Sequence, residues 1–193
     1  MVSVGGFDFM HTYVRLHGNL VAYYANTLCR AFGISPRKVV FAAYFHDYGK
    51  YKWDYDLFTK PELSEEDWEE IKKHPKESVE IVLKMMPERK DLLLEGSPSI
   101  LDLIYLHHEK PDGSGYYGVK DIPVESAIIS ISDIFDSCVS DRPYRKTMSD
   151  NDAIEIALQL YGGYLDLHGY SSDVAREVLK KSVTKITILS TAG

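Results

Sequence analysis

The sequence predicts an all-α protein built as a bundle of helices. Apolar residues recur at spacings of three and four along most of the chain, which is the period of a helix with one buried side. Several of these stretches begin with Ser-Pro or with a serine followed by acidic residues, as helix N-termini do. A length of 193 residues and a hydrophobic content of 45% suit one domain with a sizeable core. We therefore expect a single all-α domain over residues 1–193.

The expected helices follow one another along the chain. Counted from their capping residues, they cover residues 11–32, 35–45, 64–73, 75–86, 97–106, 122–136, 149–160 and 172–182. The second helix is apolar nearly all round, which predicts that it forms the buried centre of the bundle. Residues 51–63 are expected to be an aromatic-rich connector.

Local signals predict where several helices begin and end. Gly33 and Gly49 are expected to end the first two helices, and the pair Gly162-Gly163 is expected to end the seventh. Ser97 is expected to cap the fifth helix, with Pro98 in its first helical position.

Charge and cysteine content exclude several classes of function. A formal net charge of -7 argues against a general surface for nucleic acid or anionic membrane, because those partners require clustered Lys and Arg. Cys29 and Cys138 lie in apolar helical stretches, which favours buried free thiols over a disulfide or a zinc site. The N-terminus lacks a secretory signal pattern, and no apolar run reaches the roughly 18 residues of a membrane span. We expect a cytoplasmic protein.

His46 and Asp47 stand at the end of the apolar second helix. Burying them there is costly unless something satisfies them, and a metal cation does so directly, with a carboxylate that can bridge two ions. The alternative is a buried hydrogen-bonded pair, as is common for an isolated His-Asp. Lys50 is positioned to reach a phosphate oxygen or a developing negative charge.

Four further histidines and one aspartate occupy similar places. His107 and His108 end the fifth helix before a glycine-rich loop, and adjacent residues there can point at neighbouring spots. His74 lies at a helix junction, where a surface histidine at a kink is the alternative. His17 lies beside the apolar side of the first helix, and a hydrogen-bonded core histidine is the alternative. Asp133 lies amid apolar neighbours, where an unpaired carboxylate is expensive.

A basic segment follows the sixth helix. Arg142 and Arg145 lie in it, and arginine matches phosphate by forked hydrogen bonds, so the segment is the expected anion clamp of an otherwise acidic chain. A solvated basic turn is the alternative. His11 and His168 are expected at the surface.

Together these residues favour a metal-dependent hydrolase. The ordered set is His17, His46, Asp47, His74, His107, His108 and Asp133. Imidazole and carboxylate ligands without thiolate suit iron, manganese, cobalt, nickel or zinc, and they favour hydrolysis over structural zinc. Two ions about 3.5–4 Å apart, bridged by Asp47 and a hydroxide, would supply a nucleophile at neutral pH and hold a phosphate for in-line attack.

Seven motifs together resemble the HD-GYP family of the HD phosphohydrolase superfamily, over roughly residues 11–181. They are His46-Asp47-x-Gly49-Lys50, Lys60-Pro61-x-Leu63-Ser64, His74-Pro75, His107-His108-Glu109-x-x-Asp112-Gly113-Ser114-Gly115-Tyr116, Ile122-Pro123, Ser132-Asp133-x-x-Asp136 and Asp141-Arg142-Pro143-Tyr144-Arg145. The resemblance implies an HD-domain helical bundle with a metal site at its centre. It also implies a metal-dependent phosphodiesterase that opens cyclic di-GMP to linear pGpG or to GMP.

The resemblance implies roles for individual residues. The seven histidines and aspartates of the ordered set would be the metal ligands, for two ions that we expect to be iron or manganese, with zinc, nickel and cobalt as alternatives. Asp47 and Lys50 would be catalytic. Lys50, Arg142 and Arg145 would hold the phosphate, and Tyr116 would contact the nucleotide. The position of a third-metal glutamate in some members is Tyr13 here, which favours two metals.

One departure from the family affects the expected substrate. Tyr117 replaces the proline of Gly-Tyr-Pro, and the loop that leads to Ile122 is a few residues shorter than usual. Two alternatives to cyclic di-GMP hydrolysis therefore stay open. One is a phosphohydrolase of the same superfamily acting on another nucleotide, and the other is a non-catalytic, metal-containing module that binds a nucleotide or docks a partner.

Overall fold

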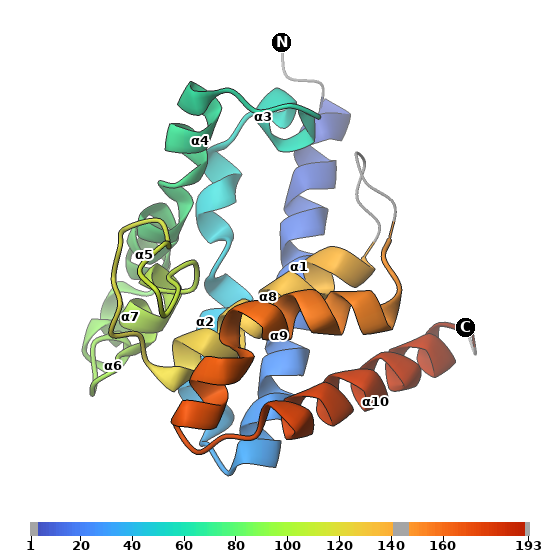
Figure 1. Ribbon diagram of the computed structural model, residues 1–193. Coiled ribbons are helices and arrows are strands. Elements are labelled where there is room, and N and C mark those ends of the chain that lie inside the picture. The colour runs from blue at the N-terminus through green and yellow to red at the C-terminus, as the bar shows by residue number, and fades with distance from the viewer. Residues whose placement is uncertain (1–3, 141–146, 192–193) are drawn as a thin grey trace.

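The chain is all-α, as predicted. The computed structural model describes residues 4–140 and 147–191, with side chains in 10–57, 59–140 and 147–183, and these residues form helices and no strand. The long helix α1 (Val4–Phe32) runs through the molecule, and α8 (Val124–Val139) and α9 (Asp150–Leu167) cross it on one side (Figure 1). Helix α10 (Ser172–Thr191) packs on α1 and α9.

The remaining helices are short. They are α2 (Pro36–Phe45), the 3-10 helix η1 (Tyr48–Lys52), α3 (Tyr55–Thr59), α4 (Glu65–Ile71), α5 (His74–Met85), the 3-10 helix η2 (Pro87–Arg89), α6 (Lys90–Leu93) and α7 (Ile100–Tyr105). The segment 51–63, expected to be a connector, thus contains the end of η1 and all of α3.

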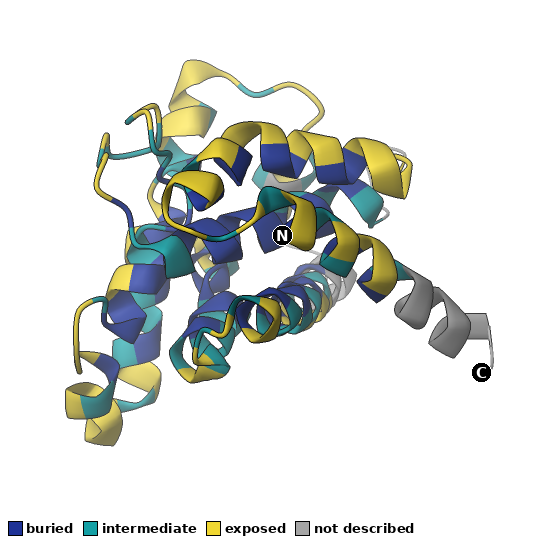
Figure 2. Cartoon of the chain, turned by 60° about the horizontal axis from the view of Figure 1, so that its bottom comes forward, coloured by how far each residue is buried: buried dark blue, intermediate teal, exposed yellow. Residues whose placement is uncertain are grey.

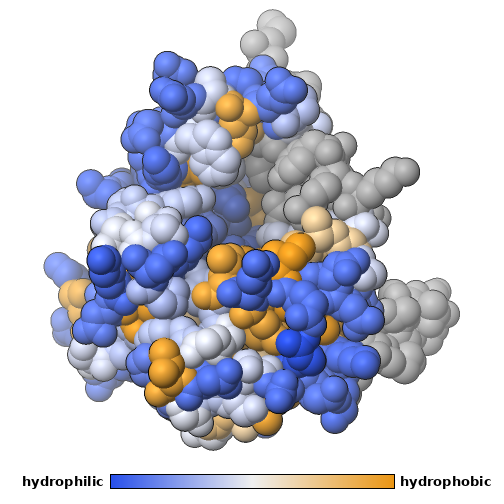
Figure 3. Space-filling view, viewed as in Figure 1, coloured by the Kyte–Doolittle hydropathy of each residue, from blue (hydrophilic) through white to orange (hydrophobic). Residues whose placement is uncertain are grey.

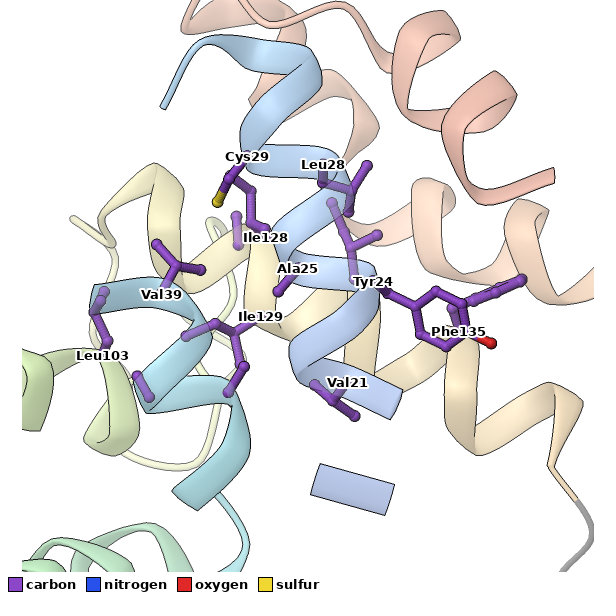
Figure 4. Packing of buried hydrophobic residues seen from close by; sticks show 14 of the residues in the cluster. Val21, Tyr24, Ala25, Leu28, Cys29, Val39, Leu103, Ile128, Ile129 and Phe135 are labelled. Atoms are coloured by element: carbon purple, nitrogen blue, oxygen red, sulfur yellow. The ribbon is translucent and has the colours of Figure 1, made fainter. Parts of the chain in front are cut away.

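The core lies where α1, α2, α7 and α8 meet. Figure 4 shows Val21, Tyr24 and Leu28 of α1 facing α8, and the ring of Tyr24 stands edge-on to Phe135 with centroids 4.9 Å apart. Every residue from 126 to 133 of α8 is buried. The buried centre is therefore α8. The prediction that α2 holds this place is wrong in part, because one side of α2 is only half-buried.

Three predicted helix ends differ from the structure, the first because α2 ends at Phe45 and Gly49 lies inside η1. The cap of α7 is Ser99, because Asp102, three residues later, completes a reciprocal pair of side-chain bonds with it. Ser97 has no such partner three residues on, so the predicted cap is wrong, and Pro98 precedes the helix. The pair Gly162-Gly163 does not end α9, which continues to Leu167. Gly162 packs against the start of α10, and a Cβ there would lie at about contact distance, 3.4 Å, from the Cβ of Ser172.

Burial follows the expected amphipathic pattern. Figure 2 shows the outer helices exposed on one side and buried on the side that turns inward. Cys29 and Cys138 are buried free thiols, as predicted. His168 is exposed as expected, whereas His11 is half-buried and stacks on Tyr51, with ring centroids 4.2 Å apart. None of the described helices has the length and apolar character needed to cross a membrane.

Candidate metal centre

The seven predicted ligands come together at one place in the bundle. His17 lies in the middle of α1, Asp133 lies in α8, and the other five stand at the ends or beginnings of short helices: His46 and Asp47 follow α2, His74 begins α5, and His107 and His108 follow α7. All but His108 are buried. Residues up to 116 positions apart in sequence thus form one cluster, as the sequence motifs predicted.

Asp47 is the centre of this cluster. Its Oδ1 lies 3.2 Å from Nε2 of His74 and 4.0 Å from Nε2 of His107, and its Oδ2 lies 3.4 Å from Nε2 of both His17 and His46. Two groups with the spacing of metal ligands result. One joins Asp47 to His74, His107 and His108, and the other joins it to His17 and His46. The two oxygens of one carboxylate therefore serve two different sets of imidazoles.

The outer nitrogens of four imidazoles fix which nitrogen faces the centre. Three rings donate Nδ1–H to the carbonyl three residues earlier, at the end of a helix where carbonyls lack helical partners. Nδ1 of the fourth ring, His17, pairs with a carboxylate. The pairs are His46 with Ala43 at 2.7 Å, His74 with Ile71 at 2.7 Å, His107 with Ile104 at 2.6 Å, and His17 with Asp136 Oδ2 at 2.6 Å. This arrangement directs the Nε2 atoms inward, as in histidines that ligate metals.

The inward-facing atoms fit a cation. Nε2 of His17, Nε2 of His46 and Oδ1 of Asp47 are buried and make no well-directed hydrogen bond, although Nε2 of His17 lies 2.9 Å from Oδ1 of Asp133. Nε2 of His74 also lies only 3.3 Å from Nε2 of His107, so two nitrogens face each other. Buried polar atoms without partners are costly, and one or more cations would satisfy all of them. The residues present therefore suit the metal that the family resemblance implies.

Three of the histidines are neutral. Burial lowers the pKa of His74, and burial together with the neighbouring His108 and His46 lowers the pKa of His107 well below its ordinary value. Burial, together with the neighbouring His74, lowers the pKa of His108 to about 3. A neutral imidazole is the form that binds a metal.

The other half of the cluster carries charge. Burial acts to lower the pKa of His17, but its hydrogen bonds to the carboxylates of Asp133, Asp136 and Asp47 outweigh it and raise that pKa well above the ordinary value. In His46, burial is likewise outweighed by the charge of Asp47, and the pKa rises to about 9. Burial opposes ionisation of Asp47 and Asp133, yet the adjacent histidines hold both pKa values well below the ordinary one. In the absence of metal, protons on His17 and His46 balance the carboxylates.

We expect metal binding to strengthen as pH rises. A divalent ion must displace the proton of His46, so affinity should increase between about pH 6.5 and pH 9. The metal-free protein should show the opposite trend, because a raised folded-state pKa contributes stability that is lost as pH rises through about 9. Melting temperatures with and without Mn²⁺ across this range would measure both trends. A stabilisation by Mn²⁺ that does not change with pH would contradict the assignment.

Two cavities open onto the cluster. The first, called here the aromatic cavity, has a volume of about 300 Å³ and is lined by Lys50, Trp53, Trp68 and Tyr116 among others. It lies in the hollow near the middle of the face in Figure 3, below α3 and α4. The second cavity has a volume of about 230 Å³, and its lining includes Lys110, Ser114 and Tyr161.

The two cavities share three residues. His108, Tyr116 and Asp133 line both of them, and the rings of His108 and Tyr116 lie 4.5 Å apart. The predicted nucleotide contact Tyr116 is therefore half-buried at the junction of the two cavities. The predicted catalytic Lys50 lines the aromatic cavity and donates from Nζ to Oδ2 of Asp47 at 2.5 Å.

The residue that departs from the family motif faces away from both cavities. Tyr117 does not line either one; its ring stacks on Tyr105 with centroids 4.5 Å apart, and its hydroxyl donates to the carbonyl of Lys72. The buried carboxylate of Glu109 accepts from the backbone N–H groups of Tyr117 and Val119 at 2.8 and 2.7 Å. These contacts hold the altered loop through groups that do not line the cavities. Tyr116, and not Tyr117, forms part of the cavity wall.

Three supporting residues were not predicted. Asp136 orients His17 through the bond described above. Ser78 of α5 donates to the carbonyl of His46 and accepts from the N–H of Gly49, and Ser130 of α8 donates to the carbonyl of His107. The role of Asp136 could have been predicted from the sequence, since it lies one helical turn after Asp133 in a very apolar helix. The roles of the two serines could not, because their hydrogen-bond partners are 23 to 32 residues away in sequence. The predicted phosphate contacts Arg142 and Arg145 lie outside the described residues.

The fold and the cluster agree with what known proteins indicate. The family model for the HD domain matches residues 9–168. The chain belongs to the HD-domain family. This result confirms the family resemblance seen in the motifs and, together with the helices described above, the predicted HD-domain bundle.

Relatives of this HD domain carry related names. A 3'3'-cGAMP-specific phosphodiesterase 3 of Vibrio cholerae is 31% identical over 156 residues, which is 77% of this chain and 32% of that protein. A cyclic di-GMP phosphodiesterase of Thermotoga maritima is 29% identical over 179 residues, which is 88% of this chain and 45% of that protein. The chain thus spans less than half the length of these relatives.

A solved structure has the same fold. The HD domain of the L. monocytogenes phosphodiesterase PgpH, in complex with cyclic-di-AMP, matches with a TM-score of 0.62 at 21% identity, covering 90% of this chain and 91% of that one. At this identity the likeness concerns the fold alone.

Proposed function

We propose that the HD domain of this chain is a metal-dependent phosphodiesterase that hydrolyses cyclic di-GMP to linear pGpG or GMP. One observation carries the proposal: a buried cluster with unpartnered imidazole and carboxylate atoms lies where two cavities meet. A cyclic dinucleotide has two nucleosides flanking its phosphates, and two cavities on either side of one cluster suit that shape. The names of the curated relatives support the same reaction class.

The proposed metal ligands are the seven histidines and aspartates, with Asp47 shared between two ions. When bound, such ions supply Lewis-acid polarisation of a phosphoryl oxygen and a water nucleophile at neutral pH. Iron or manganese is the proposed metal, since histidine and carboxylate ligands without thiolate suit both.

The chain's own residues orient the substrate around the cluster. Lys50, half-buried beside Asp47, supplies a positive charge next to the phosphate position and stabilises negative charge that develops there. The ring of Tyr116 forms the wall between the two cavities and contacts the nucleotide from there. Neutral His74, His107 and His108 do not repel a cation, whereas His17 and His46 give up protons when one binds.

A first experiment measures hydrolysis and metal content on the same sample. The protein is purified anaerobically, its metals are determined, and cyclic di-GMP hydrolysis is followed after iron or manganese is added separately. We expect turnover with about two metals per chain, as in two-metal phosphodiester hydrolysis. Bound metal without turnover of any cyclic dinucleotide would overturn the proposed enzyme in favour of a binding module. The cationic Lys50 beside Asp47 argues against that module, since metal binding alone does not require it.

A second candidate substrate is another cyclic dinucleotide. The relatives and the solved structure name 3'3'-cGAMP and cyclic-di-AMP besides cyclic di-GMP, and neither cavity carries an acidic residue other than Asp133 among its lining side chains. A panel of the three cyclic dinucleotides, compared by kcat/KM, separates these substrates.

Replacing Tyr116 by alanine is expected to raise KM more than it lowers kcat. The ring lies beside His108, and Tyr116 is not one of the seven proposed ligands, so its loss should weaken the binding of substrate and transition state alike. We expect about a 10-fold rise in KM, the size of one lost stacking contact, with metal content unchanged. Tyr55→Ala serves as a control, because Tyr55 is exposed and lines neither cavity. If Tyr116→Ala lost metal as well as substrate affinity, the ring would support the cluster itself.

A further inference from the structure

The aromatic cavity changes in chemical character along its length. Its inner end is formed by His74, His108 and Asp133 of the cluster, with Lys50 beside them. Away from the cluster its lining becomes apolar and aromatic, through Leu57, Leu63, Trp53, Trp68, Ile71 and Pro61. The inner end suits a phosphate, whereas the remainder suits a flat apolar group attached to it.

Trp53 stands between these two regions. Its ring meets His74 edge-on with centroids 5.7 Å apart, and the ammonium of Lys50 lies 5.5 Å from the Trp53 ring centroid. The side chain is half-buried, so part of it faces the cavity. Trp53 is thus adjacent both to a candidate metal ligand and to the proposed phosphate-binding lysine.

Trp68 lies further from the cluster and is 45% exposed. A large exposed aromatic side chain lining a cavity is available to a ligand at little cost in fold stability. Lys60 at the same cavity pairs with Asp67. Neither tryptophan belongs to the motifs that carry the family resemblance.

The ligand portion that fits this lining is a nucleobase. A sugar would need hydrogen-bonding side chains around it, and this part of the cavity offers mainly aromatic and aliphatic ones. A purine has a flat face that stacks on tryptophan whatever its edge groups are. Its phosphate would then lie toward Lys50 and the cluster.

We propose that Trp53 and Trp68 form a nucleobase subsite, in which Trp53 stacks on the base next to the scissile phosphate. The proposal rests on the proposed function, since it takes the phosphate position from the cluster. It makes Trp53 a determinant of affinity for nucleotides over other phosphate esters. The subsite does not by itself choose between guanine and adenine, because stacking tolerates either base.

The test uses intrinsic fluorescence, because the chain has two tryptophans and both line this cavity. The manganese-loaded protein is titrated with GMP and with ribose 5-phosphate, which differ only by the base. We expect GMP to quench the fluorescence saturably and ribose 5-phosphate to leave it unchanged. Trp53→Ala should raise the Kd for GMP about 10-fold, observed through Trp68, whereas Trp53→Phe should keep most of the affinity.

Controls separate this proposal from the proposed enzyme. Tyr55→Ala removes an exposed aromatic ring that does not line the cavity and should leave the Kd unchanged. Trp68→Ala, at an exposed position, tests the subsite if Trp53→Ala fails to fold. Equal quenching by both ligands, or an unchanged Kd in Trp53→Ala and Trp68→Ala, would overturn the subsite. The measurement does not depend on turnover, so a protein that binds GMP this way without hydrolysing cyclic di-GMP would refute only the proposed function.

Discussion

Asp47→Ala is expected to remove bound metal and phosphodiesterase activity together. The Asp47 carboxylate offers one oxygen to His74 and His107 and the other to His17 and His46, so its loss opens both halves of the cluster at once. Loss of a residue that merely orients a ligand costs about 10–100-fold in metal affinity or activity. Loss of the proposed shared ligand should therefore lower kcat by more than about 100-fold.

Metal analysis and steady-state kinetics on the same preparation would check this result. Asp47→Asn keeps the shape of the side chain and removes its charge, so it should lose nearly as much metal as the alanine variant. Asp91→Ala, which removes an exposed carboxylate on α6, is the matched control and should keep both metal and rate. Full metal occupancy and rate in Asp47→Ala would mean that Asp47 does not bridge the ions.

Sequence patterns predicted the positions that lie at helix ends. His46 and Asp47 follow an apolar helix that must stop where they begin, and His74 precedes a proline that starts another helix. Such residues are marked locally, because helix ends have local signals and buried charges need partners. The candidate ligands could therefore be named before any contact between them was known.

Features that depend on tertiary packing could not be predicted in this way. The glycines at 162 and 163 have the local appearance of a helix end, but α9 continues through them because α10 packs against that turn. The cap of α7 moved by two residues because the capping box at Ser99 outweighs the proline signal. Tyr117 was expected to alter the substrate-contacting face, yet its ring turns toward Tyr105 instead.

The second large effect is expected from Gly49→Ala, which should destabilise the protein and displace His74. Gly49 was predicted to end α2, but that helix ends at Phe45 and Gly49 lies inside η1. A Cβ at Gly49 would lie 2.1 Å from the carbonyl oxygen of His74, and that oxygen is backbone, so it cannot swing aside. The residue is glycine because η1 and the first turn of α5 touch there.

The N–H of Gly49 also donates to the hydroxyl of Ser78 at 2.7 Å, and this hydrogen bond holds η1 against α5 as well. An added methyl group must therefore push α5 away and carry His74 from Asp47. Overpacking of this kind costs about 1–3 kcal/mol, and we expect at least that loss in the free energy of unfolding. Activity should fall further than stability, because His74 belongs to the candidate ligand set.

Gly163→Ala is the matched control for this substitution. Gly163 is exposed within α9, and a Cβ there would meet nothing within 4 Å. Alanine is favoured over glycine inside helices by about 0.5–1 kcal/mol, so this variant should be slightly more stable than the parent. Chemical denaturation of both variants, with metal content measured on each, compares the two effects. If Gly49→Ala were as stable as Gly163→Ala and kept its metal, the approach of η1 to α5 would not be what seats His74 beside Asp47.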